Sequence, residues 1–501
     1  MRMLSTSLGS WDTIETGQQH KHGITFPLAI VHAIIAEAGL PEPLCWEGDE
    51  RPAVTAADLD VVLVSAMDPR HFWRVPKFLD ALGLARRADA RGPSDPIVVM
   101  GGQAATAPAP VEHLVDVVYV GEFEARGLAL MAALARLDLP RRERLELIAA
   151  IPGCLVPSMR PAGHVVAQQF SEDIGITLRE RLFVNHRKIH RVEIARGCQS
   201  MCGFCVLGWR SKYRENDADA IANSLRATRA AGIREVHLSA GDAEAHSGIA
   251  HLRALVAETG LRDHGWTGRL DTMQDCSVSA GKQFAFGIEG PSHRLRKIAG
   301  KPKLTDKYIL DEMEAYWQAG GRRAMWHTMG GLPGETDADG EALAELLDQL
   351  ATRTPAERVH LEIGRQPFGP LPHTPMQWFA PGISTERIGR AVARHVNGQR
   401  LAVVDKAGQA AADALVNAVV MRGGPEVQHV VDAGPPRLHR DERIARGQAV
   451  RWMRGAGLDP DRYLGAWDPD APTPWDHIQS AFARESVRRA YDRLARMVAG
   501  G

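Results

Sequence analysis

The amino-acid sequence predicts an α/β protein with three parts: an N-terminal doubly wound (Rossmann-like) parallel sheet, a central partial (β/α)6 barrel and a helical C-terminal region. Near-continuous apolar runs alternate with helical stretches through residues 1–140, the order typical of a parallel sheet. Residues 191–382 hold six further strand–helix pairs, too few for a complete barrel. Residues 141–190 have the Pro and Gly density of a connector, and residues 383–501 have an Ala- and Arg-rich helical pattern.

The first sheet is predicted from four apolar runs and the helical stretches between them. Strands are expected at residues 1–9, 59–67, 96–102 and 116–124, with helices at 26–40, 71–85 and 126–137. Ligands of open parallel sheets bind beyond the carboxyl ends of the strands. Those ends carry the polar or Gly-rich sequences SAMDPR, GGQAATAP and GEFEA, which we expect to line a cleft that faces the barrel.

The barrel is predicted from six short strands: RVEIAR, EVHLSAG, RLDTM, QFAFGIEG, RAMWHTMGG and RVHLEIGR. Helices are expected between most of them, most clearly at residues 217–231, 305–319 and 337–352. In such barrels the chemistry lies at the carboxyl ends of the strands. The first of these strands leads directly into the sequence ARGCQSMCGFC, which therefore marks the candidate site.

Composition limits the class of protein. A chain of 501 residues with 45% hydrophobic and 24% charged residues is typical of a multidomain globular protein. No run approaches the ~18 apolar residues that span a bilayer, and the N-terminus lacks the apolar stretch of a signal peptide, so a cytoplasmic location is expected. A net charge of −1 does not indicate a nucleic acid or a membrane as a partner.

Three of the six cysteines, Cys198, Cys202 and Cys205, lie within eight residues. In a reducing compartment such a group indicates metal or redox chemistry rather than disulfides. Structural zinc prefers four closed ligands; His190 is a candidate fourth, although a strand separates it from the cysteines. Thiolates also hold iron–sulfur clusters, and three protein ligands would leave one iron open to a small molecule.

The spacing Cys198-x3-Cys202-x2-Cys205 resembles the signature of the radical S-adenosylmethionine (radical SAM) superfamily, in which an aromatic residue, here Phe204, precedes the third cysteine. Four later segments resemble strand-end segments of that family in the same order: HLSAGDAE, FGIEGPSHRLRKIAGKP, MGGLPGET and PFGPLPHTPMQW. The resemblance implies that the three cysteines hold a 4Fe–4S cluster. It further implies that residues at these strand ends contact SAM, namely Phe204, Ser239, Gly241, Asp242, Glu289, Ser292, Arg294, Arg296 and Gly331.

In the radical SAM family, SAM chelates the open iron, and one-electron reduction of SAM breaks its S–C5′ bond to give a 5′-deoxyadenosyl radical. The cofactors carry this chemistry, while the protein binds and orients them and excludes water. The resemblance therefore implies 4Fe–4S and SAM as cofactors, and a one-electron reductant such as flavodoxin or ferredoxin as a partner. The substrate is not readable: a small molecule, a nucleoside and a peptide all remain open.

The segment VVMGGQAATAPAPVEHLVDVVYVGEFEA resembles the second half of the cobalamin-binding domain that precedes many radical SAM barrels. The resemblance implies that Gly101 and Gly102 lie close to cobalamin, since neither carries a Cβ. The Asp-x-His-x-x-Gly motif that supplies a histidine to cobalt is absent. With cobalamin, methyl transfer is expected. Without it, Phe72 and Trp73 are candidates to fill the cleft, and an adenosyl-radical rearrangement is expected.

Several isolated residues are further candidates for catalysis. His237, His327 and Cys276 lie near predicted strand ends of the barrel, and His20 and His22 follow the first strand of the chain. Buried supporting histidines are more common than catalytic ones, and a lone cysteine is usually a small buried hydrophobe. A non-catalytic iron–sulfur or zinc-binding interaction protein is the alternative from a different class.

The remaining features are expected to be structural. Lys301 and Lys303 are predicted to be surface charges, and Cys45 and Cys154 to be structural. The C-terminal segment 463–496 resembles the tail of an uncharacterised radical SAM subgroup that shares the sequence PWDHI. Its aromatic residues could cover the barrel mouth, but simple docking of a helix is the interpretation that we favour.

Overall fold

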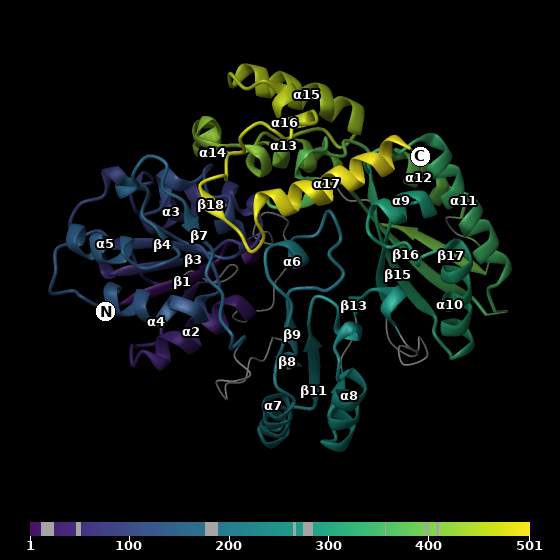
Figure 1. Cartoon of the computed structure of the whole chain (residues 1–501), viewed down its shortest axis with the longest axis horizontal. Coiled ribbons are helices and arrows are strands. Elements are labelled where there is room, and N and C mark those ends of the chain that lie inside the picture. The colour runs from purple at the N-terminus through teal and green to yellow at the C-terminus, as the bar shows by residue number, and fades with distance from the viewer. Residues whose placement is uncertain are drawn as a thin grey trace.

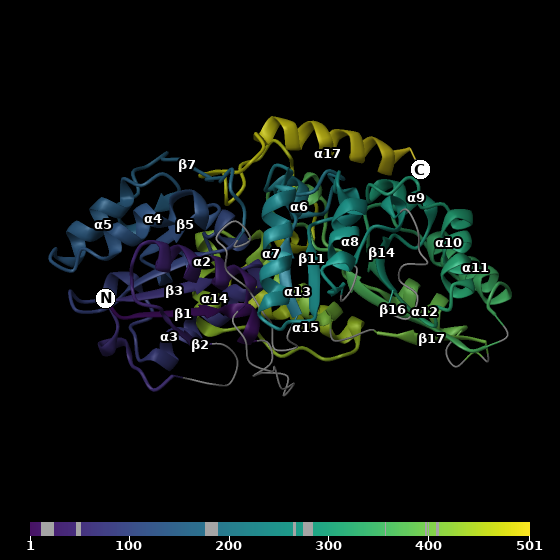
Figure 2. The same cartoon turned by 90° about the horizontal axis from the view of Figure 1, so that it is seen from below.

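A computed structural model shows the three parts of the chain side by side (Figure 1). The first sheet and its helices lie at the left, the barrel at the centre and right, and most of the C-terminal helices above both. The second view, turned by 90°, shows the same order along the long axis (Figure 2). The structure describes residues 1–11, 25–46, 52–175, 189–263, 267–273, 284–355, 357–395, 398, 400–406 and 410–500.

The first sheet has the strand order β2-β1-β3-β4-β5-β6. Its first five strands are parallel and the last pair is antiparallel. The order 2-1-3-4-5 is one of the two common doubly wound orders, with its ligand-binding switch point between β1 and β3. The strands are β1 (Met3–Ser7), β2 (Leu44–Trp46), β3 (Val61–Ser65), β4 (Ile97–Gly101), β5 (Val117–Tyr119) and β6 (Cys154–Leu155).

Helices cover both faces of this sheet, as doubly wound folds require. One face packs on α2 (Phe26–Glu37), α4 (Phe123–Leu134) and α5 (Arg141–Ala149) in a single apolar core. The other face packs on α3 (Val75–Leu82) and on helices from the far end of the chain. Helix α5 and strand β6 lie within residues 141–190, so the first part of this stretch belongs to the first domain rather than to a connector.

The barrel strands are parallel and follow the order of the chain. A three-stranded sheet contains β12, β11 and β8, and a five-stranded sheet contains β13 to β17 in order. The partial barrel is therefore confirmed. It was expected to end at residue 382, but one further strand, β17, follows that residue and joins the sheet. The strands are β8 (Ile189–Glu193), β11 (Glu235–Ser239), β12 (Arg262–Asp263), β13 (Thr267–Gly268), β14 (Phe284–Glu289), β15 (Arg323–Gly330), β16 (Val359–Pro367) and β17 (Leu401–Asp405).

One expected strand is wrong. The sequence RLDTM forms a 3-10 turn at Leu270–Thr272, and the strand residues precede it at β13. The turn is stabilised by the Thr272 hydroxyl, which donates to the carbonyl oxygen of Arg269 at 3.0 Å. Short polar side chains that bond to nearby backbone compete with strand pairing in this way.

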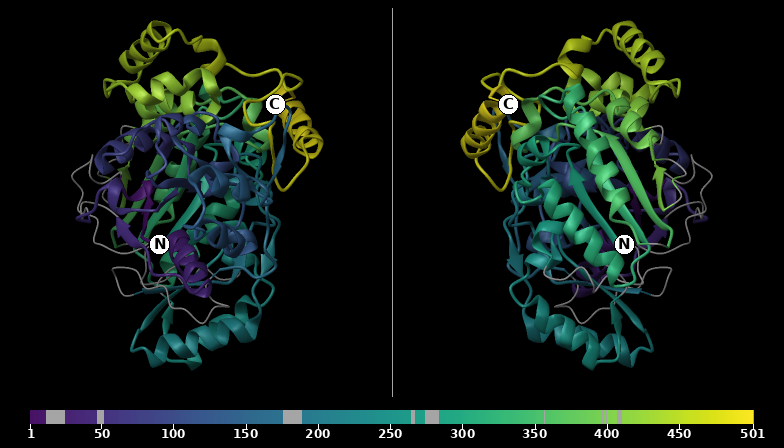
Figure 3. Two further views of the ribbon diagram at one scale, coloured as in Figure 1. Left: turned by 90° about the vertical axis from the view of Figure 1, so that its left-hand side faces the viewer. Right: turned by 90° about the vertical axis from the view of Figure 1, so that its right-hand side faces the viewer.

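Helices cover the outer side of the barrel (Figure 3). Apolar residues of β14, β15 and β16 form one core with the helices that cover them. Two of these helices have side-chain N-caps: Asp217 accepts a hydrogen bond from the amide of Ala220, and Thr305 accepts one from that of Tyr308, both at 3.1 Å. The helices are α7 (Ala218–Ala230), α8 (Ile249–Glu258), α9 (His293–Ile298), α10 (Asp306–Gln318), α11 (Asp337–Thr352) and α12 (Glu386–Ala393).

The C-terminal helices serve two different parts of the molecule. Helices α13 to α16 contribute to the core of the first sheet, where Val416 and Val419 pack with Phe72 and Trp73. Helix α17 instead crosses the barrel mouth (Figure 1). No helix of the described ranges is long and apolar enough to cross a membrane. The helices are α13 (Ala410–Arg422), α14 (Gln428–Ala433), α15 (Glu442–Gly455), α16 (Pro460–Leu464) and α17 (Arg484–Ala499).

Candidate iron–sulfur and SAM site

The three cysteines lie on the loop between β9 (Ala195–Arg196) and the short helix α6 (Val206–Trp209). Gly197 begins the loop with a φ of 81°, a conformation that favours glycine. The loop closes on itself because the Trp209 indole donates to the carbonyl of Cys202 at 3.1 Å. Its centre is fixed from outside by the amide of Met376, which donates to the carbonyl of Gly203 at 3.0 Å.

Helix α17 packs directly on this loop. A Cβ added to Gly203 would lie 2.6 Å from Cδ1 of Leu494, so the helix and the loop approach each other as closely as glycine permits. Phe204, Leu494 and Val498 pack on one apolar cluster at the barrel mouth. Helix α17 therefore packs over the cysteine loop.

Cys202 is the most enclosed of the three cysteines. A Cβ added to Gly300, whose φ is 85°, would lie 3.2 Å from Cα of Cys202. The Arg269 guanidinium donates from Nη1 to Sγ of Cys202 at 2.7 Å. Sequence reasoning missed Arg269, because an arginine in a predicted strand carries no signal that it faces a sulfur.

Burial raises the pKa of Cys202, although the charges of Arg269 and Lys301 oppose this, and it raises the pKa of Cys205 to about 12. The thiolate forms therefore need positive charge from a bound group. Among the described residues, no three side chains of His, Cys, Asp and Glu converge closely enough for a single metal ion. Tetrahedral zinc holds all its ligands on one atom. A four-iron cluster instead binds each thiolate through a different iron.

The end of β11 lies against the cysteine loop. A Cβ added to Gly241 would lie 2.7 Å from the carbonyl oxygen of Gly197 and 3.2 Å from Cβ of Cys198. Ser239 accepts a hydrogen bond from Nε of Arg191 at 2.8 Å. Asp242 is buried, and both of its carboxylate oxygens lie 3.0 Å from the Thr272 hydroxyl, whose single proton they share with the carbonyl oxygen of Arg269. Burial raises the pKa of Asp242, although this hydrogen bond opposes the shift.

Glu289 ends β14 in a strained conformation. Its φ is 59°, and the pairing register with β15 shifts between Gly287 and Glu289. Such bulges and left-handed non-glycine residues are concentrated at functional sites. The Lys301 ammonium holds the residue in place, donating to Oε1 of Glu289 at 2.8 Å and to the carbonyl of Gly287 at 2.6 Å. Lys301 is 3% exposed, so the expectation of a surface charge was wrong for this lysine.

The other residues of this segment have helix-stabilising contacts. Ser292 caps α9, and its hydroxyl donates to Oδ1 of Asp339 at 2.5 Å. Arg294 donates to Oδ2 of the same carboxylate at 2.6 Å, and the buried Arg296 pairs with Asp306. These contacts are to α10 and α11, so SAM-binding roles for these residues stay predictions.

Gly331 packs against backbone rather than lining open space. A Cβ there would lie 2.5 Å from Cα of Gly382, and the φ of Gly331 is 73°. Its amide donates to Oε2 of Glu335 at 2.6 Å. This glycine therefore closes the loop after β15, whatever further role it has.

The two candidate histidines lie on the inner side of the barrel wall. Val236 and Leu238 pack under α7 and α8, so His237 between them points inward. His327 is exposed in the middle of β15, with Gly287 and Gly364 as its paired neighbours. Their catalytic roles stay predictions. Cys276, His20 and His22 lie outside the described residues.

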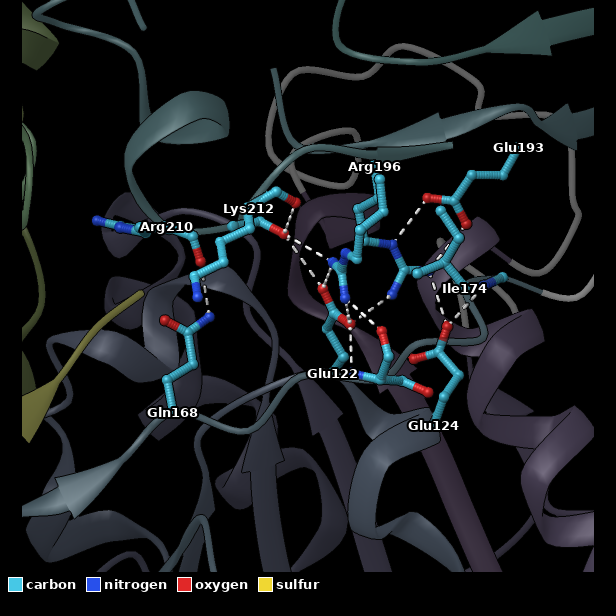
Figure 4. Close-up of polar contacts among 12 residues, drawn as sticks. Glu122, Glu124, Gln168, Ile174, Glu193, Arg196, Arg210 and Lys212 are labelled. Atoms are coloured by element: carbon cyan, nitrogen blue, oxygen red, sulfur yellow. Dashed lines mark hydrogen bonds and ion pairs between the residues drawn. The ribbon is translucent and has the colours of Figure 1, made fainter. Parts of the chain in front are cut away.

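An ion-pair network joins the first domain to the base of the cysteine loop (Figure 4). Arg196, two residues before Cys198, donates to Glu124 and to Glu193, each at 2.8 Å. Arg214 donates to Glu122 at 3.0 Å. Although burial alone would raise the pKa of Glu124, the charge of Arg196 holds it below its usual range. The sequence GEFEA after β5 thus faces the barrel, as expected.

Arg210 forms a second junction between the domains. It is buried and donates to the carbonyls of Gln103 and Pro372, each at 3.0 Å. Burial lowers its pKa to about 10, although the charges of Asp68 and Cys205 oppose this. Asp68 follows β3, so Arg210 connects the switch-point edge of the first sheet electrostatically with the cysteine loop.

His373 lies at the same junction and carries a prediction about pH. Burial, with the charge of Arg210, lowers its pKa to about 3, and its Nε2 lies 2.8 Å from the carbonyl oxygen of Thr106. The folded protein keeps this ring neutral, whereas the unfolded chain protonates it below about pH 6.5. Its stabilising contribution is therefore complete above pH 6.5 and is lost as the pH falls toward 3.

We expect the free energy of urea unfolding to fall by about 1.4 kcal/mol through this group between pH 8 and pH 5.5. The comparison is with His373→Asn, which cannot titrate and tolerates the left-handed φ of 61° at this position. The wild-type chain should lose more stability over that range than the variant. Equal pH slopes for the two proteins would contradict the assignment.

The carboxyl edge of the first sheet presents a row of small residues. Ser7, Ser65 and Gly101 are paired in register across β1, β3 and β4. The hydroxyl of Ser65 is buried without a hydrogen-bond partner among the described residues. A Cβ on Gly101 would have only the Tyr119 carbonyl oxygen within reach, at 4.0 Å.

Gly102 has a φ of 97°, and a Cβ there would lie 2.4 Å from the carbonyl oxygen of Ala66, so glycine permits close packing of the segments that follow β3 and β4. Its contact with cobalamin stays a prediction, whereas one expectation about this edge needs correction. Phe72 and Trp73 are buried in the core beneath α13. The Trp73 indole donates to Asn417 at 3.1 Å, so these two residues belong to a packed core rather than to the cleft.

Comparisons with known families agree with this geometry. The family described as "Radical SAM superfamily" matches residues 192–347, and "Radical SAM proteins, N-terminal" matches residues 51–157. The two matches together span just over half of the chain. The chain belongs to the radical SAM superfamily, and it is a radical SAM enzyme. This sets aside the non-catalytic alternative.

Several solved structures match the chain at low identity. The radical SAM methyltransferase TsrM from Kitasatospora setae, with cobalamin and a [4Fe-4S] cluster bound, matches over 100% of both chains at 15% identity and a TM-score of 0.50. The same enzyme with tryptophan and a SAM analogue matches over 75% of each chain at 15% identity and a TM-score of 0.49. Coproporphyrinogen III oxidase from Escherichia coli matches over 54% of this chain and 52% of its own at 13% identity and a TM-score of 0.26. No curated protein was found to match the sequence.

Proposed function

We propose that Cys198, Cys202 and Cys205 hold a 4Fe–4S cluster and that SAM binds beside it at the ends of β11 and β14. The observation that carries this proposal is the close packing around the cysteine loop. Gly241 packs on Cys198, Gly300 packs on Cys202, and Leu494 packs on Gly203. When bound, the reduced cluster supplies the electron that cleaves SAM to the 5′-deoxyadenosyl radical. A flavodoxin- or ferredoxin-like protein would deliver that electron.

The protein's own residues bind and orient SAM. Glu289 presents a carboxylate oxygen at the end of β14, held by Lys301, as an acceptor for a hydrogen-bond donor of SAM. Gly241 keeps the end of β11 in contact with the cysteine loop, so that a ligand held there lies next to the open iron. The apolar cluster under α17 excludes water from the same place.

We further propose that the first domain binds cobalamin and that the reaction is methyl transfer. The support is positional: the edge that carries Ser7, Ser65 and Gly101 is the ligand-binding edge of its fold, and its neighbouring loops contact the barrel through Arg196 and Arg210. TsrM, which shares the fold over its whole length, has cobalamin bound. Bound cobalamin would supply a methyl carrier between this edge and the SAM site.

The residues at the edge suit such a group. Ser65 offers a buried hydroxyl that lacks a partner within the described part of the chain, and Gly101 leaves room for a flat ligand. His71 also lies at this edge, where its Nδ1 accepts the amide of Met67 at 3.3 Å. Because Nδ1 accepts this bond, the neutral ring carries its proton on Nε2. A histidine that binds a metal through Nε2 instead carries its proton on Nδ1 and donates from there. His71 is therefore not set up to coordinate cobalt, in line with the missing histidine motif.

The test is titration of anaerobic protein with hydroxocobalamin. Gly101→Leu places a side chain over the edge at ordinary φ, and Gly92→Leu is the matched control, since its Cβ would meet only Oδ2 of Asp95 at 3.8 Å. Stoichiometric binding by the wild type and the control, with at least tenfold weaker binding by Gly101→Leu, supports methyl transfer. Absence of binding by the wild type favours the second candidate, a cobalamin-independent adenosyl-radical rearrangement.

A further inference from the structure

Arg269 makes a contact that none of the SAM-site resemblances includes. Its Nη1 donates to Sγ of Cys202 at 2.7 Å, a contact shorter than an ordinary N–H···S hydrogen bond. No described side chain donates a hydrogen bond to the sulfur of Cys198 or of Cys205. The three presumptive cluster ligands thus differ in their surroundings, and a permanent positive charge lies beside one of them.

The guanidinium is fixed on its other sides. Nε and Nη2 donate to the two oxygens of Asp271, at 3.0 and 2.6 Å, and Nη2 also donates to the carbonyl of Gly300 at 3.1 Å. The Arg269 side chain is 10% exposed and that of Asp271 is 5% exposed. The Asp271 carboxylate and the Gly300 carbonyl fix the orientation of the planar guanidinium. In this orientation Nη1 points toward Cys202.

Gly300 contacts both Cys202 and Arg269. Its carbonyl oxygen accepts from Arg269, and a Cβ added to it would lie 3.2 to 3.7 Å from Cα, Cβ and Sγ of Cys202. Cys202 is therefore in contact with the 269–271 turn and with the turn that precedes Lys301. Neither turn belongs to the cysteine loop itself.

We propose that Arg269 is a positioning residue that orients Cys202 and raises the midpoint potential of the cluster. Hydrogen bonds to the sulfurs and nearby charge are among the factors that set iron–sulfur potentials. Adding one electron makes the cluster more negative, and a donated N–H with a positive charge stabilises that state. The inference rests on the proposed function, since it requires that Cys202 is a cluster ligand.

The experiment is a potentiometric titration of anaerobically reconstituted protein with dithionite as the one-electron donor, followed by electron paramagnetic resonance of the reduced cluster. Arg269→Gln removes the charge and most of the donor fork, and Arg269→Lys restores a charge. Arg353→Gln removes a surface charge that pairs with Asp311 and serves as the control. Iron and sulfide content are measured for every variant before the titration.

We expect Arg269→Gln to have a lower midpoint potential, by an amount equivalent to a threefold to tenfold change in the ratio of oxidised to reduced cluster, where tenfold corresponds to about 59 mV for one electron. Arg269→Lys should recover part of the shift, and Arg353→Gln should match the wild type. Equal potentials for Arg269→Gln and the wild type, at equal iron content, would overturn the inference while leaving the cluster assignment intact. If Arg269→Gln fails to assemble a cluster, the midpoint potential of Arg269→Lys is the test. A potential equal to that of the wild type would overturn the proposed role of the guanidinium group. A wild-type chain that holds no cluster would instead refute the proposed function.

Discussion

A variant in which Cys198, Cys202 and Cys205 are all replaced by Ala is expected to hold almost no iron after anaerobic reconstitution, whereas the wild-type chain holds about four irons. The reason is the enclosure of the loop. Arg269 and Gly300 contact Cys202, and Gly241 contacts Cys198. Elsewhere in the described residues no three side chains of His, Cys, Asp and Glu converge to take over a metal. Iron and acid-labile sulfide are measured after desalting.

The matched control replaces two cysteines away from the loop, Cys45 and Cys154, by Ala. Cys154 is buried in the core of the first sheet and Cys45 is exposed in β2. This control should keep the full iron content. Equal iron in the triple variant and the wild type would refute the cluster assignment.

Replacement of Glu289 by Gln is expected to weaken SAM binding by about tenfold or more, equivalent to about 1.4 kcal/mol, because a charge-assisted hydrogen bond becomes a neutral one. The amide oxygen of Gln can still accept a hydrogen bond from Lys301. Gln has the same size as Glu, so the left-handed backbone conformation is no harder to adopt, and the end of β14 should stay folded. SAM affinity is measured by equilibrium dialysis on reconstituted protein.

Iron content separates this role from a structural one. The Glu289→Gln protein should retain its cluster, and Glu357→Gln, which alters a surface ion pair with Arg322, should retain both cluster and SAM affinity. A Glu289→Gln protein that loses iron but binds SAM as tightly as the wild type would show that β14 is wrongly placed relative to the cluster.

The barrel and the cysteine loop could be predicted because their signals are local. The strands β14, β15 and β16 are apolar runs buried beneath helices, and the helices α7 and α10 begin at the capping residues Asp217 and Thr305. The cysteine spacing is also a local pattern. Its position after the first barrel strand followed from the order of the elements alone.

Contacts between distant segments could not be predicted in this way. Lys301 is read from sequence as a surface charge in a Gly- and Lys-rich turn, and its burial depends on the bulge that brings Glu289 over Gly287. Arg269 gains its role only because the Gly300 turn carries Cys202 to it. Similarly, no local pattern indicates that Val416 of α13 completes the core of the first sheet.

The predicted domain boundaries at residues 140 and 382 differ from those in the structure for a related reason. Strand β6 and helix α5 are short elements in a stretch dominated by Pro and Gly, so composition concealed their pairing with the first sheet. Strand β17 follows a helix in a region of helical composition, and its apolar residues become a strand by pairing with β16. In both cases tertiary pairing decided the structure.

The most direct test of the account is the formation of 5′-deoxyadenosine. Reconstituted wild-type protein with dithionite and SAM under anaerobic conditions should release 5′-deoxyadenosine, detected by mass spectrometry, and the triple cysteine variant should release none. A wild-type protein that carries its full complement of iron and binds SAM, yet releases no 5′-deoxyadenosine under these conditions, would contradict the assignment of this site to reductive SAM cleavage.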